Sequence, residues 1–187
     1  MGVSKEQTAR NRQAIVTAAA KLFRQRGVDG VGIVELMKEA GFTQGGFYNH
    51  FESKQDLASE VVGAALEAGK RQLGDDLSRQ LDYYFSTGHR DDVENGCPVG
   101  GLARDVANLN QSAQQRFATG LNEAFSAFEA MLPPKTSGST LADRERAIGL
   151  YCEMVGALLI ARSISATEPA LSEEVLRAAH RDTQAKL

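Results

Sequence analysis

The stretch that decides the fold runs from Ile33 to Leu57 and reads I-V-E-L-M-K-E-A-G-F-T-Q-G-G-F-Y-N-H-F-E-S-K-Q-D-L. Its apolar residues Ile33, Leu36 and Ala40 recur at i, i+3 and i+7, which is the spacing of one face of an α-helix. Gly41 follows directly, and a glycine at this place commonly ends a helix. The stretch therefore begins with a short amphipathic helix that ends at Ala40.

A second short helix is expected directly after this glycine. Thr43 stands at a position suited to an N-cap. In a helix from Gln44 to Phe51, Phe47 and Phe51 would share one face, and the polar side chains would turn elsewhere. Two short helices joined by a tight glycine turn form a helix-turn-helix.

A third helix is predicted from Ser53 onward. Ser53 followed three residues later by Asp56 is a capping-box pattern. Lys54 then lies in the first turn, where the helix dipole disfavours a cation. A phosphate bound beside this helix end would account for the lysine.

The combined pattern resembles the DNA-binding region of the tetracycline-repressor (TetR) family. The matching residues are Ala40, Gly41, Phe42, Thr43, Tyr48, His50, Phe51 and Lys54, at the family's fixed spacing. The resemblance implies an all-α protein. A three-helix helix-turn-helix DNA-binding domain would span residues 1–53, and a helical ligand-binding and dimerisation domain would span residues 54–187.

The resemblance also implies a ligand-responsive transcriptional regulator. It would be a repressor that binds a palindromic double-stranded DNA operator as a homodimer and is released by a small-molecule inducer. The residues implied in DNA binding are Thr43, Gln44, Gly45, Gly46, Tyr48, Asn49, His50 and Lys54. The alternative is a helical small-molecule-binding protein or enzyme with a vestigial helix-turn-helix. Binding to a duplex with inverted half-sites would distinguish the two.

Four of these residues carry alternatives of their own. Adjacent glycines at 45 and 46 are costly, because glycine loses about 1 kcal/mol relative to alanine inside a helix. Either packing around Phe47 holds this helix start, or the missing side chains let the backbone lie close to base edges. Tyr48 and His50 are expected to contact phosphate, but an aromatic ring beside a histidine can also cap a small core.

The first helix is expected from Thr8 to Arg26. Its apolar face consists of Ile15, Ala18, Ala19, Leu22 and Phe23. Its basic side chains form either a solvated face or a phosphate-contacting one, and the resemblance favours phosphate contact at Arg10 and Arg12. Gly32, where the family usually has Thr or Ser, is a weak N-cap for the following helix.

Composition and charge agree with a globular DNA-binding chain. The 187 residues are 42% hydrophobic and carry a formal net charge of -3. Residues 1–55 hold 8 Lys+Arg against 5 Asp+Glu, and residues 56–187 hold 13 against 19, so the basic charge accompanies the helix-turn-helix. Without a signal-peptide pattern or a charge-free apolar span, we expect a cytoplasmic protein with no membrane partner.

Sequence patterns of catalysis are missing. There is no phosphate-binding glycine loop, no H-E-x-x-H and no G-x-S-x-G, and the histidines at 50, 89 and 180 are scattered. Cys97 and Cys152 are far apart and outside any C-x-x-C, so we expect reduced thiols rather than a disulfide or a zinc site. We therefore expect no enzyme activity, cofactor or metal.

Further helices are predicted from Lys54 to Leu73, around Leu77–Phe85, from Pro98 to Leu109, from Ser112 to Leu132, from Leu141 to Ile164 and after Ser172. The polar run from His89 to Gly96 predicts a solvated loop.

The last two helices suit a dimer interface. The helix up to Ile164 is apolar almost all round, so it must be covered on most sides. Its small residues Gly149, Gly156 and Ser163 recur every seven positions and would let another helix approach closely. The residues of the final helix expected to face inward are Leu171, Val175, Ala178 and Ala179. A four-helix dimer interface is what the resemblance implies for this pair.

A ligand pocket is expected around Cys97. The candidate lining residues are Tyr84, Phe85, Cys97, Phe117 and Phe125. Helix N-termini favour the reactive thiolate, which would let Cys97 sense electrophiles or oxidants. The alternative is that Cys97 is a small buried hydrophobe. Cys152 is expected in the core.

Overall fold

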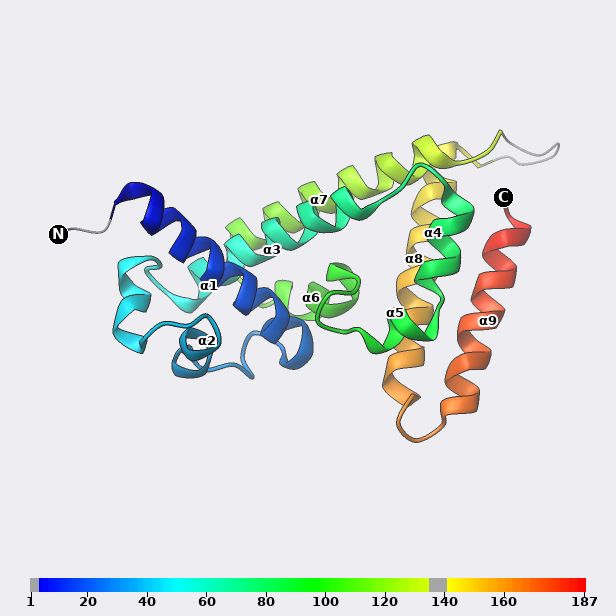
Figure 1. The fold of residues 1–187 in the computed structure, drawn as a ribbon. Coiled ribbons are helices and arrows are strands. Elements are labelled where there is room, and N and C mark those ends of the chain that lie inside the picture. Colours follow the sequence, from blue (N-terminus) through cyan, green and yellow to red (C-terminus); the bar gives the residue numbers. More distant parts are fainter. Residues whose placement is uncertain (1–3, 135–140) are drawn as a thin grey trace.

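The computed structural model describes residues 4–134 and 141–187, and its regular elements in these ranges are all helices (Figure 1). The elements are α1 (Lys5–Arg26), α2 (Ile33–Glu39), the 3-10 helix η1 (Gln44–Asn49), α3 (Lys54–Gln72), α4 (Leu77–Tyr84), α5 (Thr87–Asp91), α6 (Pro98–Val106), α7 (Gln111–Met131), α8 (Asp143–Ile164) and α9 (Pro169–Ala185). The predicted all-α fold is confirmed.

The helices form a long body with a small N-terminal group at one end. Helices α1 and α2 and η1 gather around the start of α3, which then runs beside α7 along the molecule (Figure 1). Helices α8 and α9 lie side by side at the other end, with α4 packed against α9. Helix α6 lies between α1 and α8 and contacts both. The helix-turn-helix is thereby joined to the rest of the chain through α3 and α6.

Local sequence explains several helix ends. The Ser53 hydroxyl accepts a hydrogen bond from the Asp56 amide at 3.1 Å, and the Asp56 carboxylate accepts one from the Glu52 amide at 3.3 Å. The expected serine cap is confirmed, but the capping box is incomplete because Asp56 accepts from Glu52 and not from the N-cap Ser53. Helix α1 begins earlier than predicted because the Ser4 hydroxyl caps the Gln7 amide at 3.1 Å.

Two glycines end the first helices. Gly27 after α1 has a φ of 75°, and Gly41 after α2 has a φ of 82°. Both values lie in the left-handed region, which side chains other than glycine rarely adopt. The predicted stops at these positions are confirmed.

The core of the N-terminal group is aromatic and aliphatic. Phe47 and Phe51 are buried with ring centroids 5.6 Å apart, as their spacing predicted. Phe23 of α1 and Leu36 and Met37 of α2 are buried with them. Burial of these side chains supplies the main stabilisation of this small unit.

The second helix of the helix-turn-helix differs from the prediction. It is the six-residue 3-10 helix η1, not an α-helix that reaches Phe51, and Thr43 makes no side-chain cap bond although its backbone has N-cap geometry. Two adjacent glycines lower the α-helical propensity of this segment, and 3-10 geometry is tolerated in such short pieces.

The predicted solvated loop from His89 to Gly96 is also wrong in part. Its beginning belongs to α5, which starts because the Ser86 hydroxyl caps the His89 amide at 3.1 Å. His89 and Arg90 are buried. Both side chains have hydrogen-bond partners, which makes burial of polar groups tolerable.

The outer face of α8 and α9 corrects three expectations. Cys152, expected in the core, is exposed, and Leu171 and Ala178, expected to face inward, are exposed as well. These residues lie on helix faces that the rest of this chain leaves uncovered. Helix α8 is also the one helix in the described part of the chain that is long and apolar enough to cross a membrane, a test that core helices pass too.

Candidate DNA-binding surface and ligand cavity

Most of the residues predicted to bind DNA lie together on η1 and its flanks. Thr43, Gln44, Gly45, Tyr48 and Asn49 are exposed, and Gly46, His50 and Lys54 are half-buried. The inner side of η1 is anchored by Phe47, which is fully buried. The short helix therefore presents a polar edge to solvent on an apolar base.

Tyr48 does not belong to the core. Its side chain is 67% exposed, and its ring meets Phe47 edge-on with centroids 5.3 Å apart. The core-capping alternative is thus excluded for Tyr48. His50 differs, because its Nδ1 is buried and has no hydrogen-bond partner among the described residues.

Packing does not require glycine at 45 or 46. A Cβ atom at Gly45 would meet nothing within 4 Å, and one at Gly46 would meet only Met37 Cε at 3.6 Å, an ordinary contact. The alternative that packing around Phe47 selects these glycines therefore lacks support. Close approach of the backbone to base edges stays a prediction.

Arg12 has a structural role that the sequence did not reveal. Its Nε donates to Glu60 Oε2 at 2.9 Å, its guanidinium lies 4.1 Å from the centroid of the Phe51 ring, and it also donates to the His50 carbonyl. Arg12 therefore joins α1, α3 and the end of η1, and phosphate contact by Arg12 stays a prediction. Arg10 pairs with Glu6 at 2.6 Å and stays largely exposed.

Lys54 also has a partner within the protein. Its Nζ donates to the Val31 carbonyl at 3.1 Å and so ties the start of α3 to the turn before α2. This bond accounts for a cation at a helix N-terminus without a phosphate. Phosphate contact by Lys54 stays a prediction.

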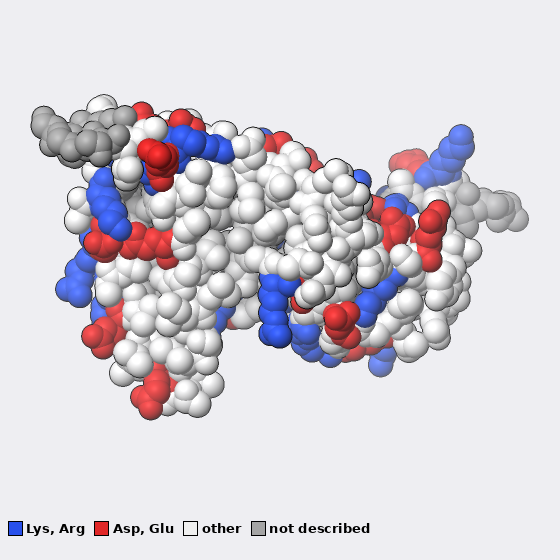
Figure 2. All heavy atoms as spheres, turned by 180° about the vertical axis from the view of Figure 1, so that it is seen from behind, with Lys and Arg blue, Asp and Glu red and all other residues white. Residues whose placement is uncertain are grey.

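The charge around the helix-turn-helix is largely paired. Figure 2 shows the side opposite to Figure 1, where Lys and Arg atoms lie beside Asp and Glu atoms over the N-terminal part, at the right of the view. Arg26, for example, pairs with Glu35 at 2.7 Å. Lys38 on α2 is exposed. The excess of basic residues therefore forms no continuous patch on this side.

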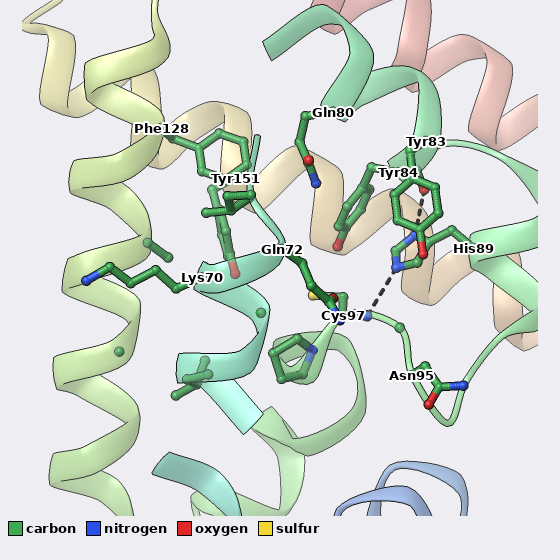
Figure 3. Close-up of a pocket in the computed structure, with 17 residues that line it drawn as sticks. Lys70, Gln72, Gln80, Tyr83, Tyr84, His89, Asn95, Cys97, Phe128 and Tyr151 are labelled. Carbon is green, nitrogen blue, oxygen red and sulfur yellow. Dashed lines mark hydrogen bonds between the residues drawn. The ribbon is translucent and has the colours of Figure 1, made fainter. Parts of the chain in front are cut away.

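A cavity of about 100 Å³ lies where α3 to α8 meet (Figure 3). Its side chains include Gln72 and Lys70 from α3, Gln80, Tyr83 and Tyr84 from α4, His89 from α5, Cys97 and Pro98 from the start of α6, Phe128 from α7 and Tyr151 from α8. The wall is mostly aromatic and aliphatic, with a few polar groups, as is usual for small-molecule sites.

Two of the five residues predicted for a ligand pocket line this cavity, namely Tyr84 and Cys97. Phe85 is buried away from it, with its ring 5.6 Å from that of His180 in α9. Phe125 lies behind the wall, edge-on to Tyr151 at 5.4 Å, and Phe117 is partly buried against the core. The structure therefore separates these three phenylalanines from the cavity.

His89 is the lining residue that the sequence reading placed wrongly. Its Nδ1 lies 2.8 Å from the Tyr84 carbonyl and donates to it, and its Nε2 accepts from the Cys97 amide at 3.1 Å. Burial lowers the pKa of His89, which favours this neutral form. The signal that could have found it is Ser86, a helix-capping residue three positions earlier.

Two tyrosine hydroxyls point towards Cys97 from opposite sides of the cavity (Figure 3). The Tyr84 hydroxyl is buried and has no hydrogen-bond partner among the described residues. Burial, and then the neighbouring Cys97, raises the pKa of Tyr84 well above its ordinary value. The pKa of Tyr151 is raised for the same reasons in the same order. Both phenols therefore remain protonated donors at neutral pH.

The segment that enters the cavity is held from both ends of the molecule. On the helix-turn-helix side, Arg24 Nη1 donates to the Glu94 carbonyl at 2.7 Å, and Gln25 Nε2 donates to Glu94 Oε1 at 2.7 Å. On the other side, Arg162 of α8 donates to the carbonyls of Arg90 at 2.8 Å and His89 at 3.0 Å.

Gly96 in this segment leaves no room for a side chain. A Cβ atom there would lie 2.6 Å from the Asp92 carbonyl oxygen, 2.7 Å from Arg162 Nη2 and 3.2 Å from His89 Nε2. The glycine therefore permits the close packing that brings Cys97 into the cavity wall.

The described residues contain no group of three His, Cys, Asp or Glu side chains that could hold a metal ion.

Comparisons with known proteins agree with this geometry. Residues 15–61 match the family model described as bacterial regulatory proteins, tetR family. The transcriptional regulator LmrA of Bacillus subtilis is 26% identical over 175 residues, covering 86% of this chain and 91% of the relative. The repressor BepR of Brucella suis is 39% identical over 62 residues, covering 33% of this chain and 30% of the relative.

The fold of this chain is also similar to that of solved TetR-family structures. The crystal structure of a TetR transcriptional regulator from Chloroflexus aurantiacus superimposes with a TM-score of 0.75, covering 95% of this chain and 94% of that chain at 22% identity. The match to the family model lies on the helix-turn-helix, and the likeness of fold and sequence extends through the C-terminal helices. Residues 15–61 therefore form a DNA-binding domain of the tetR family of bacterial regulatory proteins, and the whole chain has the fold of TetR-family regulators.

Proposed function

We propose that this protein is a cytoplasmic repressor that binds a palindromic DNA operator as a homodimer and leaves it when a small molecule occupies the cavity. The main observation behind the proposal is that η1 has one buried side and one exposed side. Phe47 anchors the helix in the core, whereas Tyr48 beside it is 67% exposed. An exposed polar edge on a fixed base is what insertion into a DNA groove requires.

The exposed residues on η1 and its flanks would contact different parts of the DNA. Gln44 and Asn49 would contact base edges, since amide side chains form bidentate hydrogen bonds with adenine. Gly45 would let the backbone approach the bases. Thr43 and Tyr48 would hold phosphates, which fix the register of the protein on DNA.

The half-buried residues would add to phosphate contact. Lys54 would reach a phosphate by exchanging its bond to the Val31 carbonyl. His50 would contact a phosphate of the same stretch of DNA backbone. Its Nδ1 is buried and has no hydrogen-bond partner in the described chain.

A second copy of this chain would cover the outer face of α8 and α9. Ile160 is 54% exposed and Leu171 is 47% exposed on this face. A Cβ atom at Gly149 or Gly156 would meet nothing within 4 Å, so another helix has room to approach there. Apolar helices of two copies would form an isologous four-helix interface. This would place two η1 edges on successive turns of DNA, about 34 Å apart.

The ligand signal would travel through the segment between α5 and α6. This segment carries Cys97 in the cavity wall, and α1 holds it through Arg24 and Gln25. A ligand that displaces the segment would therefore shift α1. The distance between the η1 helices of the two copies would then change. Ligand binding and DNA binding would be coupled through these contacts.

The proposal is tested by selecting duplex fragments with the purified protein and measuring their binding by fluorescence anisotropy. A repressor of this kind binds inverted half-sites more tightly than either half-site alone. Gln44→Ala should lower affinity for the selected duplex by about 1–3 kcal/mol while leaving random DNA unaffected. Gln115→Ala changes an exposed glutamine on α7 and is the matched control.

Two results would contradict the proposal. If no duplex is enriched, the chain is a helical binding protein with a vestigial helix-turn-helix. If Gln44→Ala weakens selected and random DNA equally, η1 is not the reading element.

A further inference from the structure

We infer that the cavity takes a small, uncharged, single-ring molecule whose oxygen accepts a hydrogen bond from Tyr84. The inference rests on the proposed function, because this molecule would be the inducer, and it names the ligand's chemistry. Its basis is a cavity of limited size, an apolar wall and one buried donor without a partner.

The size of the cavity limits the ligand to one ring. Its volume is about 100 Å³. For comparison, an apolar cavity of about 150 Å³ inside a protein binds benzene. A fused-ring or chain-like inducer would need side chains to move, whereas a six-membered ring needs little expansion.

The walls favour a flat or cyclic hydrocarbon body. The Tyr151 ring forms one side and is fixed from behind by Phe128, whose centroid lies 5.2 Å away in edge-on geometry. Tyr84 forms the facing side (Figure 3). Leu66 and Pro98 complete the apolar surface. A ring between two aromatic side chains buries apolar surface on both faces.

Of the two phenols that face Cys97, Tyr84 has the hydroxyl that is buried without a hydrogen-bond partner among the described residues. Burial raises the pKa of Tyr84, so the hydroxyl keeps its proton and acts as a donor. The thiol of Cys97 is its neighbour, but sulfur is a weak acceptor and satisfies a hydroxyl donor less well than an oxygen would. A ligand carbonyl oxygen would satisfy this donor.

The buried histidine of the wall is already engaged. His89 uses both ring nitrogens, one on the Tyr84 carbonyl and one on the Cys97 amide. Arg24 and Arg162 do not line the cavity, although Arg24 Nε is also buried without a partner among the described residues. Within the cavity wall, the Tyr84 hydroxyl is therefore the buried donor without a partner.

A charged ligand would find no free side chain of opposite charge in the wall, because the lining holds no Asp or Glu and the nearby Arg24 and Arg162 lie outside it and donate to backbone carbonyls. Lys70 is the lining residue with a charged side chain, and its Nζ is exposed and paired with Glu123 at 3.1 Å. An ion moved into this cavity would lose its hydration without replacement, which is strongly unfavourable. The ligand is therefore neutral.

The test compares cyclohexanone with methylenecyclohexane, which share ring and shape but differ in a carbonyl oxygen against a methylene group. Dissociation constants are measured by NMR titration of the 15N-labelled protein, with the His89 and Cys97 amides as reporters. We expect the parent to bind cyclohexanone about fivefold more tightly, the value of one buried hydrogen bond. Tyr84→Phe should abolish this preference while keeping the affinity for methylenecyclohexane.

Tyr83→Phe is the matched control, because Tyr83 also lines the cavity but is 55% exposed. This variant should keep the preference of the parent. A parent that binds neither molecule, or binds both equally, overturns the inference even if Tyr84→Phe fails to fold. Retention of the preference in folded Tyr84→Phe overturns it as well.

Operator binding is measured on the same preparations. Normal operator binding without a ketone preference overturns the ligand chemistry alone. A parent that enriches no operator duplex overturns the proposed function, whatever the two ring compounds do.

Discussion

Arg24 of α1 donates a hydrogen bond of 2.7 Å to the backbone carbonyl of Glu94, three residues before Cys97 in the cavity wall. This bond links α1 of the N-terminal group to the segment that leads into the cavity wall. Arg24→Met keeps the aliphatic stem that packs on Gly101 and removes the donor. We expect amide hydrogen exchange of residues 94–98 to accelerate about tenfold, because a bond from a charged donor is lost.

Mass spectrometry of exchanged peptides measures this effect. The matched control is Arg71→Met, which removes an exposed ion pair with Glu67 on α3. Such pairs contribute little to stability, so its exchange pattern should equal that of the parent. Unchanged exchange in Arg24→Met would show that α1 does not restrain the segment.

Gly45→Ala should separate folding from DNA binding. The added Cβ atom meets nothing within 4 Å, and alanine favours helical backbone by about 1 kcal/mol, so the free energy of unfolding should stay equal or rise slightly. Operator affinity should fall, because the methyl group would stand between backbone and bases. Urea unfolding and anisotropy titration measure the two effects. A variant with full operator affinity would show that the backbone at Gly45 does not approach DNA.

Gly156→Leu should open the dimer. Position 156 has free space around its Cβ in the single chain, so leucine fits the monomer but would occupy the place of the partner helix. Light scattering should report a dimer for the parent and a monomer for the variant. Ala118→Leu on the exposed side of α7 is the control and should remain dimeric. A monomeric parent, or a dimeric Gly156→Leu, would place the interface elsewhere.

The role of Cys97 is tested with N-ethylmaleimide. Because Cys152 is exposed, it would react as well, so the experiment starts from Cys152→Ser. If Cys97 senses electrophiles, the reagent should release this protein from its operator and leave the double variant with Cys97→Ser bound. Anisotropy measures release, and mass spectrometry measures labelling. Equal behaviour of the two proteins would leave Cys97 as a buried packing residue.

Stability should fall with acidification through His89. Burial lowers the pKa of His89 below the ordinary value of 6.5, so the unfolded chain binds the proton more readily than the fold. The free energy of unfolding should therefore decrease as the pH falls below 6.5. His89→Gln, which has no titrating ring, should show a flatter dependence in urea unfolding at several pH values. Parallel curves for the two proteins would contradict this origin.

Periodicity predicted the helices well because each apolar stripe is local in sequence. Phe47 and Phe51 are four residues apart, and their shared burial follows from that spacing alone. The form of η1 was harder to predict, because two glycines weaken the α-helix without specifying what replaces it.

The cavity could be predicted only in part, because its wall is assembled from six helices. Tyr84 and Phe85 are adjacent in sequence, yet one faces the cavity and the other faces α9, since one helical step turns a side chain by about 100°. Lys54 gives a second example. Its partner, the Val31 carbonyl, comes from a turn 23 residues earlier. No local sequence pattern predicts this hydrogen bond.

The crowding around Gly96 provides a way to compare relatives. Any side chain there would meet the Asp92 carbonyl oxygen, Arg162 Nη2 and His89 Nε2, which lie 2.6, 2.7 and 3.2 Å from the Cβ position. A homologue with a larger residue at this place must therefore have moved the backbone or at least one of these side chains. Position 96 is thus a place where related sequences can be compared for their ability to build the same cavity wall.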